Sequence, residues 1–251
     1  MLLSEEELKI EERRLNNIIK NNCKKCNGKG YILKENDEYQ LSKECECIKK
    51  IKRNLNLLDW GVPKKFIQDE WEEKLKNKSY YPRVKNYFDN FKENYRNNRG
   101  IFFHGPHGRG KTTAECVIAK HVSAMYNEDT LRCFTVAFAL FSDIIKMSFD
   151  MEKNKLNQFL YKSDLLIIDN IGNENGKNDN RFSQRFLENI IRKRDNDCKP
   201  LILSSNYDMK EIKENYGEDV HDFIISNNEI IKILGENHRV ENQVVEKQED
   251  F

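Results

Sequence analysis

The chain has 251 residues, 38% hydrophobic and 34% charged, which is enough for one large domain or for a small domain joined to a medium one. Its 43 basic and 42 acidic residues leave a net charge of +1, which excludes a strongly basic or acidic chain, so any contact with nucleic acid must come from a local patch. No signal peptide or membrane-length apolar run is present, and we expect a cytoplasmic protein with no membrane partner.

The first twenty residues predict a short helix. Ser4 followed three residues later by Glu7 is the signature of a capping box. The apolar residues that follow recur at loosely helical spacing, and these are Leu8, Ile10, Leu15, Ile18 and Ile19.

Four cysteines then follow in the pattern C-x₂-C-x₁₈-C-x-C, and these are Cys23, Cys26, Cys45 and Cys47. Four thiolates suit a closed tetrahedral zinc site, and residues 30–45 between the pairs predict a two-stranded hairpin, as in a zinc ribbon. An iron–sulfur cluster and four unliganded thiols are the alternatives. The other cysteines, Cys116, Cys133 and Cys198, stand among apolar residues and are expected to be buried.

A basic helix is predicted over residues 48–58, where the cations are Lys49, Lys50, Lys52 and Arg53. They are either a nucleic-acid contact or an ordinary solvated helix face. Gly61 and Pro63 end this helix, so we place a domain boundary here. The predicted organisation is an N-terminal metal-binding unit at 1–60, a nucleotide-binding domain at 61–240 and a flexible tail at 241–251.

The second unit alternates short apolar strands with helices, which predicts an α/β fold with a buried parallel sheet flanked by helices. Strands are expected within 100–105, 164–172 and 199–206, helices at 83–98, 111–126 and 181–196, and a strand followed by a helix within 131–147.

A glycine-rich stretch between the first strand and its helix fits G-x-x-x-x-G-K-[ST], the phosphate-binding loop of nucleotide-binding proteins. Its amides and those of the following helix turn would hold ATP, and the residues concerned are Gly105, Pro106, His107, Gly108, Arg109, Gly110, Lys111, Thr112 and Thr113. Lys111 would reach the β- and γ-phosphates, and the Thr112 hydroxyl would bind Mg²⁺.

Two further strands end in polar residues that complete such a site. Asp169 is predicted to hold Mg²⁺ through water. The next position, where a carboxylate normally activates the attacking water, is Asn170, unless Asn170 only caps its strand. Glu174 is a possible substitute from the following loop. Asn206 is expected to contact the γ-phosphate or the attacking water, the alternative being a turn residue.

The order of these motifs resembles the DnaC/DnaI-type replicative helicase loaders, which are AAA+ ATPases related to the IstB-type transposition helpers. The motifs that carry the resemblance are CKKCNGKGY, CEC, GVPKKF, the phosphate loop, LLIIDNIG, KPLILSSN and LGENHR, from about residue 23 to residue 239.

The resemblance implies that Lys111, Thr112, Asp169 and Asn206 are Walker A, Walker B and sensor positions. It also implies an N-terminal module that docks on a hexameric replicative helicase, and an ATPase domain that self-associates and contacts single-stranded DNA. The arginine finger of such proteins has no counterpart in 217–223, where the sequence is GEDVHDF with the acidic Asp219, so weak hydrolysis is expected. Arg194 and Arg239 are other possible contacts with a neighbouring subunit, although a salt bridge is an alternative for Arg194 and a plain surface position for Arg239.

Two other functions fit the same sequence. One is an IstB-like transposition helper, and the N-terminal cysteine module argues against it. The other is a zinc-ribbon nucleic-acid-binding protein whose phosphate-loop domain is degenerate, which predicts no affinity for ATP.

Overall fold

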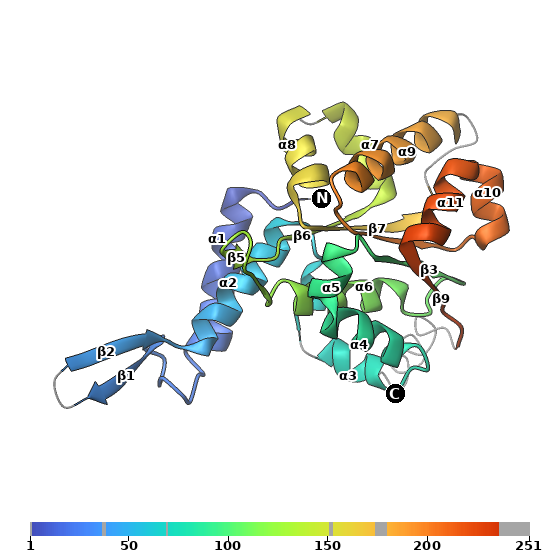
Figure 1. Cartoon of the computed structure of the whole chain (residues 1–251). Coiled ribbons are helices and arrows are strands. Elements are labelled where there is room, and N and C mark those ends of the chain that lie inside the picture. Colours follow the sequence, from blue (N-terminus) through green and yellow to red (C-terminus); the bar gives the residue numbers. More distant parts are fainter. Residues whose placement is uncertain (1, 37–38, 69, 151–152, 174–179, 236–251) are drawn as a thin grey trace, which may run out of the picture.

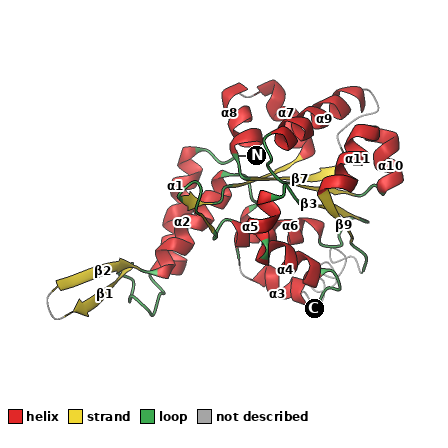
Figure 2. Cartoon of the chain, in the orientation of Figure 1, coloured by secondary structure: helices red, strands yellow, loops and turns green. Residues whose placement is uncertain are grey.

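The computed structural model describes residues 2–36, 39–68, 70–150, 153–173 and 180–235 (Figure 1). Five short, mostly apolar segments pair there as one parallel sheet in the order β6-β7-β8-β3-β9. The strands are β3 (Gly100–His104), β6 (Val136–Leu140), β7 (Leu165–Ile171), β8 (Leu201–Ser205) and β9 (Asn228–Lys232). This arrangement confirms the predicted α/β fold with a parallel sheet, because both sheet faces are covered by helices (Figure 2).

One helical layer covers the face of the sheet that carries Ile101 and Phe103. It contains η2 (Lys64–Ile67), α3 (Glu70–Lys76), α4 (Tyr81–Asp89), α5 (Phe91–Arg96) and α6 (Lys111–Val122). The single helix predicted over 83–98 is therefore wrong. Asn90, at φ −103° and ψ 22°, leaves the helical region, so α4 and α5 are separate helices.

The second layer packs on Phe102, Leu166 and Leu203, on the opposite face. It contains α7 (Phe141–Asp150), α8 (Lys153–Asn157), η3 (Gln158–Lys162), α9 (Asn180–Asn196), α10 (Met209–Tyr216) and α11 (Glu218–Asn227). A small ribbon of β4 (Tyr126–Asn127) and β5 (Arg132–Cys133) precedes β6.

The N-terminal part consists of α1 (Glu5–Leu15), η1 (Asn16–Lys20), the antiparallel hairpin β1 (Tyr31–Asn36) and β2 (Tyr39–Glu44), and α2 (Glu46–Asp59). The predicted capping box at Ser4 and Glu7 is present. The hairpin projects away from the sheet, whereas the far end of α2 joins the first helical layer through Leu57 and Leu58 (Figure 1).

Among the described residues no helix is long and apolar enough to cross a bilayer.

Candidate functional site

The phosphate loop leaves the carboxyl end of β3 and enters α6 at Lys111. Three glycines in it have left-handed φ angles, with Gly105 at 143°, Gly108 at 75° and Gly110 at 101°. A Cβ atom on Gly105 would lie 2.2 Å from the carbonyl oxygen of Ile233, so the close backbone approach admits only glycine there. The spacing recognised in the sequence therefore has the strand–loop–helix geometry that a phosphate loop needs.

Lys111 points into this loop and is buried. Its ammonium group donates to the carbonyl oxygens of Gly105 (2.5 Å) and Pro106 (3.0 Å) and to Oδ1 of Asn206 (2.8 Å). The lysine thus lies with its charge at the mouth of the loop, where a bound phosphate would replace carbonyl oxygens as its partner.

Thr112 and Asp169 meet at the edge where β7 ends. The Thr112 hydroxyl donates to Oδ2 of Asp169 at 2.6 Å, and the buried Ser204 hydroxyl donates to Oδ1 at 2.5 Å. A carboxylate and a hydroxyl oxygen side by side are the hard ligands that Mg²⁺ prefers, so these two residues fit a magnesium ion. Bound there, Mg²⁺ would neutralise charge on the nucleotide phosphates.

Asn170 and Asn206 lie beside each other at the same sheet edge. The Asn206 amide donates to Oδ1 of Asn170 at 3.1 Å, and the Asn170 backbone amide donates to the Ser204 hydroxyl at 3.1 Å. Asn170 has a φ of 65°, a left-handed conformation that asparagine tolerates better than most residues. Through the Lys111–Asn206 bond, one hydrogen-bonded chain therefore joins the predicted Walker A lysine to both asparagines.

The remaining loop residues line the opening. Pro106 and His107 are exposed, whereas Arg109 and Thr113 are half-buried. Tyr80, which was not predicted, supports the loop from behind, because its hydroxyl donates to the Arg109 carbonyl oxygen at 3.2 Å. Burial raises the pKa of Tyr80 to about 12. Tyr80 lies 25 residues before the loop in the sequence, and no local sequence pattern predicts its contact with the loop.

Glu115 is a second residue that sequence reasoning missed. It is fully buried in α6, and neither carboxyl oxygen has a hydrogen-bond partner among the described residues. Burial, and then the nearby charge of Asp169, raise its pKa well above the ordinary value of 4.5. The only available signal was an acid in the otherwise apolar helix segment AECVIA.

The residues expected at a contact with a neighbouring subunit have other environments in the structure. Arg194 is fully buried and donates to the carbonyl oxygens of Leu160, Ser163, Asp164 and Pro200. Both interpretations of Arg194 are therefore wrong, because its hydrogen-bond partners are carbonyl groups inside the same chain and one serine hydroxyl. Asp219 pairs with Arg192 at 2.7 Å. Glu174 and Arg239 lie outside the described residues.

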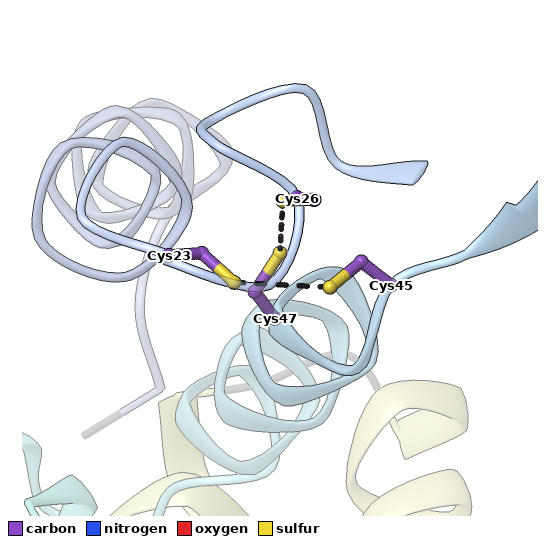
Figure 3. A group of neighbouring side chains, drawn as sticks. All are labelled: Cys23, Cys26, Cys45 and Cys47. Atoms are coloured by element: carbon purple, nitrogen blue, oxygen red, sulfur yellow. Dashed lines mark hydrogen bonds between the residues drawn. The ribbon is translucent and has the colours of Figure 1, made fainter. Parts of the chain in front are cut away.

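The four cysteines of the N-terminal module converge in space (Figure 3). Their Sγ atoms all lie within 4.8 Å of one another, with Cys23–Cys45 at 3.8 Å and Cys26–Cys47 at 3.6 Å. Sulfurs bound tetrahedrally to zinc at about 2.3 Å stand about 3.8 Å apart, so two sulfur pairs already have this spacing and the four residues fit Zn²⁺.

The environment of Cys26 also suits a thiolate. Its burial opposes ionisation, but a hydrogen bond from the Gly30 amide at 3.2 Å and contacts with neighbouring thiols lower its pKa to about 7. Of the other cysteines, only Cys116 is buried as expected. Cys133 and Cys198 are exposed, because they lie in β5 and in the turn after α9 rather than in the core.

The basic residues after the cluster lie on α2. Lys49 pairs with Glu46 at 3.2 Å and Lys52 with Glu44 at 2.5 Å, and Arg53 contacts Asn54. Neighbouring acids therefore offset the charges of Lys49 and Lys52, as on an ordinary solvated helix face.

A phosphate loop after β3, an acid near the end of β7 and, between these strands, β8 ending in Ser204 and Ser205 define a P-loop nucleotide-binding domain. The sequence shows the family directly. The chain belongs to the bacterial DnaA ATPase domain family, whose model matches residues 76–220, more than half of the chain. No curated protein matches the sequence.

The fold is shared with the solved structure of DnaI. The crystal structure of DnaI is similar over 71% of this chain and 95% of its own, at 17% identity and a TM-score of 0.57. That of the DnaC helicase loader covers 60% of this chain and 86% of its own, at 21% identity and a TM-score of 0.47. AMPPCP-bound DnaA from Aquifex aeolicus covers 69% and 51%, at 20% identity and a TM-score of 0.47.

Proposed function

We propose that this protein is a helicase loader that acts in the cytoplasm at the initiation of DNA replication. In this proposal the ATPase domain, at 61–240, binds ATP with Mg²⁺, self-associates and contacts single-stranded DNA. The N-terminal unit, at 1–60, docks on a hexameric replicative helicase. The observation that carries the proposal is the joining of a DnaA-type ATPase domain to a projecting four-cysteine module on one chain (Figure 1).

ATP binding is supported by the residues that converge on the phosphate loop. Lys111 supplies a positive charge at the loop, Thr112 and Asp169 offer oxygen ligands for Mg²⁺, and Asn206 stands within hydrogen-bond distance of the lysine. Hydrolysis is expected to be slow, because the Asn170 amide orients water but takes no proton. The segment where an arginine finger is expected adds to this expectation. It holds the acidic Asp219, which pairs with Arg192 of the same chain.

Docking through the N-terminal unit is supported by the hairpin surface. Tyr31, Ile32 and Leu33 are 45%, 38% and 50% exposed on a strand that projects from the body. Large apolar side chains exposed next to one another are typical of interaction surfaces. In the proposal, the metal fixes the base of the hairpin, and the hairpin meets the helicase.

The nucleotide part is tested by equilibrium titration with ATP and Mg²⁺. Lys111→Ala is expected to weaken ATP binding by at least about tenfold, because a charge-assisted contact to phosphate is lost. Lys74→Ala, at an exposed site on α3, is the matched control. Equal affinity of the wild type and Lys111→Ala would show that ATP is not held by this loop.

The helicase part is tested with purified hexameric replicative helicase from the same organism. Complex formation is followed by the mass of the complex, with and without ATP. A Tyr31→Ser/Leu33→Ser double variant changes one hairpin face, since alternate residues share a face, and is expected to lose most of the complex while keeping ATP affinity. Ile225→Ser, at an exposed apolar site on α11, is the control. If the wild-type chain forms no complex with the helicase, its function as a helicase loader is excluded.

A further inference from the structure

A polar cavity of about 490 Å³ opens at the amino edge of the sheet, where β7 and β8 begin. The phosphate loop lies at the opposite, carboxyl edge. Residues of η3, the end of α9 and the segment before β8 line the cavity, with amide side chains of α8 and η3 at its rim. The charged and aromatic lining residues are Tyr161, Lys162, Lys193, Asp197 and Lys199.

The lining carries an excess of positive charge. None of its three lysines forms an ion pair with a carboxylate in the described ranges. The Lys193 ammonium stands 3.8 Å from the ring centre of Tyr161, and Lys199 donates to the Tyr161 carbonyl oxygen at 2.7 Å. Asp197 is the one acid among the lining residues. The lining residues therefore carry three positive charges and one negative charge.

A further cation lies behind this wall. Arg194 is buried, and its burial lowers its pKa to about 9. The pKa of Lys199 is also lowered, first by partial burial and then by the charge of Arg194. Asp164, whose charge acts on both Arg194 and Lys199, is already engaged by Arg132 at 2.6 Å. An anion in the cavity would relieve this crowding of positive charge.

We propose that this cavity binds phosphate groups, as a site separate from the phosphate loop. Lysine ammonium groups and side-chain amides are suitable donors to phosphate oxygens, and the volume lies within the range of ligand pockets. Because the lysines act as point charges, the site recognises phosphate rather than a base sequence. The phosphate comes either from a free polyphosphate or from the backbone of a nucleic acid. This inference does not depend on helicase loading.

The test counts phosphate sites on the full chain, using inorganic tripolyphosphate as the probe. Calorimetry is expected to find two sites in the wild type, one in Lys111→Ala and one in a Lys162→Gln/Lys193→Gln double variant. The circular dichroism spectrum of the double variant shows whether it still folds like the wild type. Lys74→Gln/Lys210→Gln, with two lysines on exposed helix surfaces, is the matched control and keeps both sites. Two sites in the cavity variant, or a single site in the wild type, would overturn the proposal.

A second arm identifies the source of the phosphate. A fluorescent oligothymidylate is titrated into the Lys111→Ala chain at low salt. If the cavity serves a nucleic acid, the two cavity substitutions made in that chain weaken binding by about tenfold. If it serves free polyphosphate, the oligonucleotide binds with equal affinity to Lys111→Ala with and without the cavity substitutions. Tripolyphosphate then still binds more tightly to the chain that keeps the cavity lysines. The ATP affinity of Lys111→Ala tests only ATP binding by the phosphate loop, and the cavity variant tests only the second phosphate site. Either proposal can therefore fail while the other holds.

Discussion

Replacing Glu115 by glutamine tests whether the folded chain holds a neutral carboxyl group beneath the magnesium ligands. The folded pKa of Glu115 is raised above 4.5, so the folded chain keeps a proton that the unfolded chain releases. Stability then falls as pH rises from 4.5 towards the folded pKa, by up to about 1.4 kcal/mol per pH unit. Glutamine does not ionise and escapes this loss. The stability of Glu115→Gln relative to wild type should therefore grow as the pH rises from about 5 to 7, at no more than this rate.

The assay is urea unfolding at several pH values, with zinc present and with nucleotide and Mg²⁺ absent. Trp60, which stacks on Phe159, and Trp71, which packs on Phe66, report the transition by fluorescence. Glu93→Gln, at an exposed position on α5, is the control and should follow the wild-type pH dependence. Parallel pH curves for the wild type and Glu115→Gln would refute the reasoning, because they would mean that Glu115 ionises as freely in the folded chain as in the unfolded one.

Three further outcomes are expected. Gly105→Ala should weaken ATP binding and destabilise the chain by about 1–3 kcal/mol, as measured by titration and urea unfolding, because its Cβ would meet the Ile233 carbonyl oxygen. Cys45→Ser should lower zinc content and expose residues 22–47 to protease while ATP affinity stays, and retained zinc at wild-type affinity would contradict the four-thiolate site. Asn170→Asp, which tolerates the left-handed backbone, should raise ATP turnover by about tenfold or more, whereas fast turnover by the wild type would show that the missing carboxylate does not limit the rate.

Local patterns predicted the parts of the fold that depend on local chemistry. The apolar strands, the phosphate loop and the capping box at Ser4 each have a short sequence signature, and each is present in the structure. The strand β9 was not predicted, because its five residues, NEIIK, hold only two apolar residues and no alternation that would mark a strand. It is held in the sheet by β3, which pairs with it along its whole length.

Long-range contacts decide the rest of the site. Asp169 and Asn206 could be placed near the loop from the rule that parallel strands end at one edge, but nothing local showed that Tyr80 supports the loop. The exposed positions of Cys133 and Cys198 differ from the expectation for the same reason, since burial depends on which segments cover a residue and not on its neighbours in sequence.

The length of α2 has a mechanical consequence. Cys45 caps its amino end and Cys47 lies in its first turn, and at its other end the Trp60 carbonyl oxygen accepts a hydrogen bond from the Phe138 amide of β6 at 2.9 Å. Fourteen helical residues span about 21 Å, so α2 acts as a lever arm between the hairpin and an edge strand of the sheet. A tilt of about ten degrees at Trp60 moves the cysteine cluster by about 4 Å. A force on the hairpin would thus act on β6, the neighbour of the strand that holds Asp169.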